Sequence, residues 1–176
     1  GVDAENFGSG NTTVTTVGPV NVTTGNGIFA LTTGGNVSVI AGDVTAASNT
    51  AIIAQQTKVA GAGNVDVTAG NVSGTTGIDA HNFGTGTVSV TANGTVTGTF
   101  AEGIKATGND AVTVSVADTV TGATRGLSLV GGTGGAGSTA TVITTESVPT
   151  ILSFCGLTPP KGLKQITIGV GGLTLQ

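Results

Sequence analysis

The sequence contains no tryptophan, tyrosine or methionine, and only 8% of its 176 residues are charged. An average soluble domain has about 25% charged residues. Helical bundles are built from strong helix formers such as Leu, Glu, Lys and Arg, which are scarce here. Nucleic-acid binding needs a basic surface and usually stacking aromatic side chains. With a formal net charge of −4 and 3% aromatic residues, both of these protein classes are excluded.

Disulfides and membrane spans are also missing. The single cysteine, Cys155, cannot form an intramolecular disulfide, which fits either a cytosolic protein or an exported one without disulfides. No segment approaches the roughly 20 apolar residues of a membrane helix, and the first residues do not resemble a signal peptide. Because the sequence starts at Gly1 and contains no Met, we expect a piece of a longer protein or a processed one.

The sequence is rich in residues suited to strands and tight turns, with 32 glycines and many Thr, Val and Asn residues. The mean hydropathy of +0.37 argues against a disordered chain. A motif of the form Gly, aliphatic, any, Ala recurs along the sequence. It starts at Gly1, Gly27, Gly77 and Gly103, with looser copies at Ala51 and Gly126. The spacings are 26, 24, 26, 26 and 23 residues.

Two further motifs recur in fixed order within each unit. The first is Val-x-Val, with its pairs at Val37/Val39, Val65/Val67, Val88/Val90 and Val112/Val114. The second is Val-Thr/Ser-Ala/Gly, starting at Val44, Val72, Val96 and Val120. Three short strands in a period of about 25 residues are typical of one coil of a parallel β-solenoid. The sequence therefore predicts an all-β parallel β-helix of five to six coils.

In such a fold, equivalent inward residues of successive coils stack about 4.8 Å apart. The predicted inward columns are Val39/Val67/Val90/Val114, Val44/Val72/Val96/Val120, Ile28/Ile52/Ile78/Ile104/Leu127 and Ala30/Ala54/Ala80/Ala106. Gly and Asn are expected at the corners because they tolerate positive φ angles. Residues 1–148 are predicted to form the coils. Residues 149–176, with three of the four prolines, are predicted to form a cap over the open coil end or an atypical tail, with strands at 166–168 and 173–175.

The coil sequences GNVDVTAGNVSGTTGIDAHNFGTG and TVSVTANGTVTGTFAEGIKATG resemble the passenger β-helix of bacterial autotransporters and, more loosely, filamentous-haemagglutinin-type adhesins. The resemblance covers residues 1 to about 148. It implies a right-handed β-helix that is secreted to the bacterial cell surface, with membrane attachment only through a C-terminal β-barrel that this sequence does not contain. It also implies an adhesin or its stalk, whose partners are host or neighbouring-cell surfaces, matrix components or further copies of itself. The sequence after Pro149 departs from this pattern.

Catalysis needs clustered titratable groups, and candidates are few. His81 is the only histidine and shares a face with Asp79, but one His and one carboxylate make a poor metal site. We expect a solvated surface histidine. Cys155 has no neighbour in sequence that would activate a thiol. We therefore expect no enzyme activity, metal or cofactor. The alternative is a polysaccharide-binding or polysaccharide-degrading β-helix protein, which would need paired carboxylates on one face.

Two outward faces are candidate binding surfaces. The strand that begins with the Val-Thr/Ser motif presents a single Thr-x-Thr pair, Thr97/Thr99, which makes it a weak ice-binding array. The strand that carries the Gly-aliphatic-x-Ala motif is more varied, and we predict that it forms the contact surface. Its residues include Phe29, Leu31, Ile53, Asp79, His81 and Lys105. The apolar members are expected to form a small exposed patch, or else to pack under a loop, and Asp79 and Lys105 to form a weak ion pair.

Overall fold

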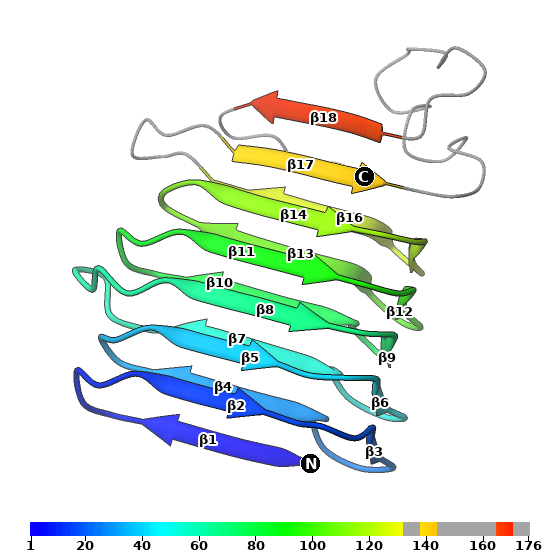
Figure 1. Ribbon diagram of the computed structural model, residues 1–176, viewed down its shortest axis with the longest axis horizontal. Coiled ribbons are helices and arrows are strands. Elements are labelled where there is room, and N and C mark those ends of the chain that lie inside the picture. Colours follow the sequence, from blue (N-terminus) through cyan, green and yellow to red (C-terminus); the bar gives the residue numbers. More distant parts are fainter. Residues whose placement is uncertain (132–137, 144–164, 171–176) are drawn as a thin grey trace.

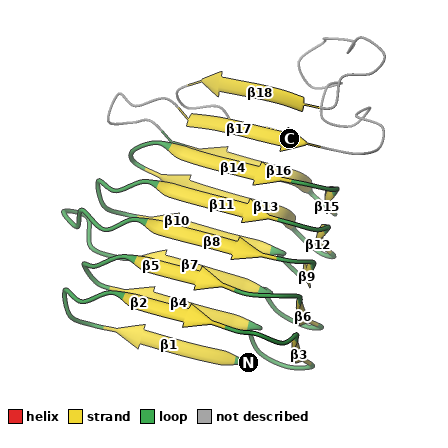
Figure 2. Ribbon diagram, in the orientation of Figure 1, coloured by secondary structure: helices red, strands yellow, loops and turns green. Residues whose placement is uncertain are grey.

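The computed structural model describes residues 1–131, 138–143 and 165–170, and these residues form strands and turns without any helix (Figures 1 and 2). The strands belong to three sheets, and each strand of a coil pairs in parallel with its equivalents in the coils before and after it. In Figure 1 the coils lie one above another from β1 to β16. The predicted parallel β-solenoid, with about five turns, is confirmed.

Each coil contributes one strand to each of the three sheets. Sheet A consists of β1 (Val2–Asn6), β4 (Ile28–Thr32), β7 (Ile52–Gln56), β10 (Ile78–Asn82), β13 (Glu102–Gly108) and β16 (Arg125–Val130). Sheet B consists of β2 (Thr12–Thr15), β5 (Val37–Ile40), β8 (Val65–Ala69), β11 (Val88–Ala92), β14 (Val112–Val116), β17 (Ser138–Ile143) and β18 (Gln165–Val170). Sheet C consists of β3 (Val20–Val22), β6 (Val44–Ala46), β9 (Val72–Gly74), β12 (Val96–Gly98) and β15 (Val120–Gly122).

The strand register places the predicted columns as expected. In sheet A, Ile78 lies between Ile52 and Ile104, and the alanine column runs beside it. In sheet B, Val90 pairs with Val67 on one side and Val114 on the other. Val96 does the same with Val72 and Val120 in sheet C. Since β-branched residues pack well on pleated surfaces, these stacked columns fill a single shared interior.

A polar column lies inside this apolar core, at the end of the sheet A strands. Thr32, Gln56 and Asn82 are equivalent residues of successive coils, and all are buried. The Thr32 hydroxyl donates to the Gly10 carbonyl at 2.7 Å, and the Asn82 amide donates to the Gly63 carbonyl at 2.8 Å. Gln56 Nε2 donates to the Thr33 and Lys58 carbonyls, while its Oε1 is buried without a hydrogen-bond partner. These side chains therefore satisfy backbone groups of the turns that lead into sheet B.

The backbone angles at the corners contradict the prediction that glycine and asparagine adopt positive φ angles there. Among the described residues, Gly25 is the only one with a clearly positive φ, and no asparagine has one. Most corner glycines are needed because neighbouring coils approach closely. A Cβ atom on Gly86 would lie 2.1 Å from the Gly63 carbonyl oxygen, and one on Gly77 would lie 2.4 Å from that of Gly103.

Asparagine serves a different purpose at these corners, where its side chain ties one coil to the next. Between sheets A and B, the Asn36 N–H donates to Asn11 Oδ1 at 2.9 Å, and the Asn64 N–H donates to Asn36 Oδ1 at 2.8 Å. Between sheets B and C, the Asn71 N–H donates to Asp43 Oδ1 at 2.8 Å, and the Thr95 N–H donates to Asn71 Oδ1 at 3.0 Å. We call these two series the corner ladders. They hold both ends of the sheet B strands.

Part of the predicted cap lies within the described residues. Strand β17 continues sheet B in parallel with β14, and β18 pairs with β17 in the antiparallel direction (Figure 1). The predicted strand at 166–168 is thus confirmed, whereas the one at 173–175 lies outside the described residues, as does Cys155. The boundary at residue 148 also lies outside them and stays a prediction.

Two isoleucines of adjacent coils test the inward columns. Ile78 is fully buried, whereas Ile53 points outward and is half-buried. We expect Ile78→Ala to lower the free energy of unfolding by about 2–5 kcal/mol, the usual cost of truncating a buried Ile, and Ile53→Ala to cost clearly less. Urea denaturation of both variants checks this. Equal losses would contradict the assignment of inward and outward faces.

A pair of glycines tests the close approach of the coils. Gly86→Ala would drive a Cβ atom against backbone, whereas a Cβ on Gly42 meets nothing closer than 3.8 Å. Because packed backbone cannot move aside, we expect Gly86→Ala to lower the melting temperature by several degrees, on the scale of a loss of about 1–3 kcal/mol. Gly42→Ala should leave it nearly unchanged in the same thermal scan. An unchanged melting temperature in Gly86→Ala would contradict the conclusion that close approach of neighbouring coils requires glycine at this corner.

Candidate contact surface on sheet A

The outward side of sheet A carries the six predicted contact residues in two adjacent rows. We call this side the A face. The first row runs Asp3, Phe29, Ile53, Asp79 and Lys105. The second row runs Glu5, Leu31, Gln55, His81 and Thr107. The structure thus brings all six predicted residues together on four consecutive coils.

The apolar members of the A face are less exposed than a free patch would be. Phe29, Leu31 and Ile53 are each half-buried, so the predicted exposed patch is a partly covered stripe. In a flat in-register sheet the side chains of adjacent coils stand close to one another, and each covers part of its neighbour. The acidic side chains Asp3 and Glu5, on the first strand, are exposed.

Charged residues lie at both ends of this stripe. Lys105 Nζ lies 3.5 Å from Asp79 Oδ2, which confirms the predicted pair, and Arg125 Nη1 lies 3.7 Å from Glu102 Oε1. Both pairs link adjacent coils at the surface, where an ion pair contributes about 0–1 kcal/mol. The other carboxylate oxygen of Asp79, Oδ1, is buried without a hydrogen-bond partner.

His81 differs from the solvated surface histidine that we expected. It is half-buried, and its ring stacks on Phe83 with centroids 3.9 Å apart and planes 14° from parallel. Burial lowers the pKa of His81 below its usual value of 6.5, while the charge of Asp79 raises it and that of Lys105 lowers it. The neutral imidazole is therefore favoured. The surface predicted from the sequence does not include Phe83. Phe83 is two residues after His81, so the alternation of inward and outward residues would have placed it on the same side of the sheet.

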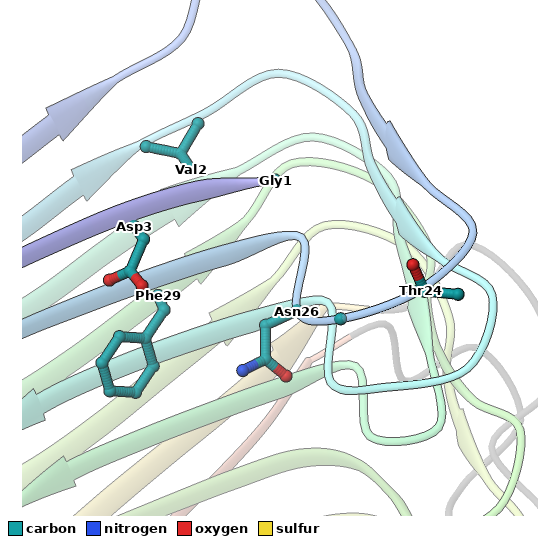
Figure 3. Close-up of a pocket in the computed structure, with 7 residues that line it drawn as sticks. Gly1, Val2, Asp3, Thr24, Asn26 and Phe29 are labelled. Carbon is teal, nitrogen blue, oxygen red and sulfur yellow. The ribbon is translucent and has the colours of Figure 1, made fainter.

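A shallow depression of about 360 Å³ opens beside the A face, between the first two coils (Figure 3). Asp3 and Phe29, which are register partners, line it together with Thr24 and Asn26 from the turn after sheet C. A carboxylate, an amide, a hydroxyl and an aromatic ring can bind a polar ligand with an apolar side, such as a sugar. Sequence alternation could not reveal this grouping, because it does not predict the path of the turn.

Within the described part of the chain, no group of three or more His, Cys, Asp or Glu residues is arranged to hold a metal ion. None of the described residues lies in a helix long and apolar enough to cross a membrane. No protein-family model, curated protein or solved structure matches this chain.

The environment of His81 predicts a pH-dependent stability. Since its pKa is lower in the folded than in the unfolded protein, the unfolded state binds more protons just below pH 6.5. Stability is expected to fall as the pH drops from 6.5 toward the folded-state pKa. His81→Gln, which copies Gln55 of the preceding coil, should remove this part of the pH dependence. Chemical denaturation from pH 4.5 to 8 measures the difference, and parallel curves for the two proteins would refute the assignment.

Proposed function

We propose that this protein is a structural and adhesive segment of a secreted bacterial surface protein, acting as a rigid scaffold for attachment or self-association. The observation that carries the proposal is the uninterrupted stack of in-register coils with the varied A face along one side. In a solenoid each coil contacts only its neighbours, so stability grows coil by coil and the surface is extended rather than enclosed. Such a surface suits binding to another broad surface.

The A face is the proposed contact surface. Its centre is an apolar stripe of Phe29, Leu31 and Ile53, and its rim carries Asp79, His81 and Lys105. An apolar centre with a polar rim is the usual anatomy of a protein interface. The proposed partners are host or neighbouring-cell surfaces, matrix components or a second copy of the chain. Secretion to the bacterial cell surface rests on the resemblance of the coil sequences to autotransporter passengers.

The alternative is a polysaccharide-binding or polysaccharide-degrading protein, and two observations favour it. The depression beside Asp3 and Phe29 offers groups that bind sugars. Asp3 and Glu5 also lie two residues apart on the same outward side of β1, and a pair of carboxylates on one face is what a glycosidase needs. Both are exposed, whereas a catalytic pair needs one acid in a protective environment. We therefore rank binding above cleavage within this alternative.

Serine substitutions on the A face test the proposal. We expect Phe29→Ser combined with Ile53→Ser to reduce binding to cells or matrix, or self-association, by at least tenfold, because the apolar centre of the contact is removed. Ile40→Ser is the matched control, since Ile40 is an exposed isoleucine on the outward side of sheet B. Cell-binding assays and analytical ultracentrifugation provide the readouts, with circular dichroism to confirm folding.

Unchanged adhesion and self-association in a folded double variant would refute the A face as the contact surface. Oligosaccharide binding by the natural protein that is lost in Asn26→Ala, with adhesion unchanged, would instead support the polysaccharide alternative.

A further inference from the structure

The outward side of sheet B, which we call the B face, carries two rows of hydroxyl residues. The described residues of the first row are Thr13, Ser38, Asp66, Ser89 and Thr113. Those of the second row are Thr15, Ile40, Thr68, Thr91 and Ser115. Eight of these ten residues are Thr or Ser. The backbone register continues into β17, where Thr139 pairs with Thr113 and Thr141 pairs with Ser115.

The hydroxyl groups of the B face are free to bind something else. None of the eight takes part in a side-chain hydrogen bond within the described protein, and all eight residues are exposed or half-buried. Other hydroxyls are used internally. The Thr12 hydroxyl, one residue before the first row, donates to the Leu31 carbonyl at 2.8 Å. Beside sheet C, the Thr99 hydroxyl donates to the Gly74 carbonyl at 3.0 Å, and the Thr97 hydroxyl accepts from that of Thr121 at 3.4 Å. Both hydroxyls of the Thr97/Thr99 pair therefore take part in internal hydrogen bonds.

The B face is also rigid and nearly uncharged. The two corner ladders hold β5, β8 and β11 at both ends, from Asn11 to Thr87 on one side and from Asp43 to Thr95 on the other. Its only charged residue among the ten is Asp66, which is exposed. The A face, by contrast, carries Asp79, Lys105 and the pair of Glu102 and Arg125.

These properties define the chemistry of the partner. A neutral surface whose groups both donate and accept hydrogen bonds complements a neutral lattice that does the same. The hydroxyls repeat about every 4.8 Å across the strands and about 6.8 Å along them, a two-dimensional spacing similar to that of water molecules on the faces of hexagonal ice. A sugar-binding surface would present aromatic rings or carboxylates, and among the ten residues there is only Asp66.

We propose that the B face binds ice, with the free hydroxyls of Thr68, Ser89, Thr91, Thr113 and Ser115 anchoring a layer of ordered water that joins the crystal. The second row is continuous over three coils, from Thr68 to Ser115, and Ile40 interrupts it in the coil before. The first row is continuous from Ser89 to Thr113, and Asp66 interrupts it in the coil before. Because the side chains stand on a fixed sheet, little conformational freedom is lost when many weak contacts form together. This function is separate from the contact surface proposed on sheet A.

The test measures thermal hysteresis and the adsorption of the fluorescently labelled chain to an ice crystal. Thr91→Lys places a charged side chain in the middle of the B face and is expected to abolish most of the hysteresis. Thr97→Lys is the matched control, because Thr97 is a half-buried outward threonine of sheet C, and it should retain the activity. Asp66→Thr, which completes the first row, should raise the hysteresis. Circular dichroism shows that each variant is folded.

Several results would overturn the proposal. The first is the absence of thermal hysteresis and ice adsorption in the natural chain. The second is an equal loss of hysteresis in Thr91→Lys and Thr97→Lys, and the third is binding to microcrystalline cellulose without binding to ice. None of these results bears on the A face, since Phe29→Ser and Ile53→Ser, which remove the proposed adhesive contact, lie on sheet A.

Discussion

The structure depends on in-register stacking of like residues from coil to coil. Each backbone ladder brings equivalent residues about 4.8 Å apart, so that Ile78 lies between Ile52 and Ile104. A shift of one residue would turn every inward side chain of a strand outward. The apolar columns therefore fix the register, and the register in turn arranges the outward residues in rows. The A face and the B face are consequences of how the core packs.

Much of this could be predicted from the sequence because two periods coincide. The repeat of about 25 residues identifies equivalent positions, and the alternation within each strand separates inward from outward residues. Together they predict the columns and even a side-chain contact such as Asp79 with Lys105. What they cannot predict depends on rotamers and turn paths. The stacking of His81 on Phe83 and the approach of Asn26 to Asp3 and Phe29 are of this kind.

The corners show the same limit in another way. Glycine and asparagine were correctly placed there, but for a reason that the backbone angles contradict. A single sequence does not reveal that the carbonyl of Gly63 leaves no room for a Cβ atom on Gly86. Nor does it reveal that Asn36 both donates its N–H to the preceding coil and accepts from the following one. These are contacts between coils, which appear only when the coils are stacked.

The three faces differ because the core constrains only inward residues. An outward substitution on a strand usually changes stability by less than about 0.5 kcal/mol, so each face can carry its own chemistry on one scaffold. Sheet A gathers charges, aromatic rings and the depression beside Phe29. Sheet B presents free hydroxyls between two corner ladders. Both proposed activities use the same physical advantage, since groups held in fixed rows can bind an extended surface through many contacts that are individually weak.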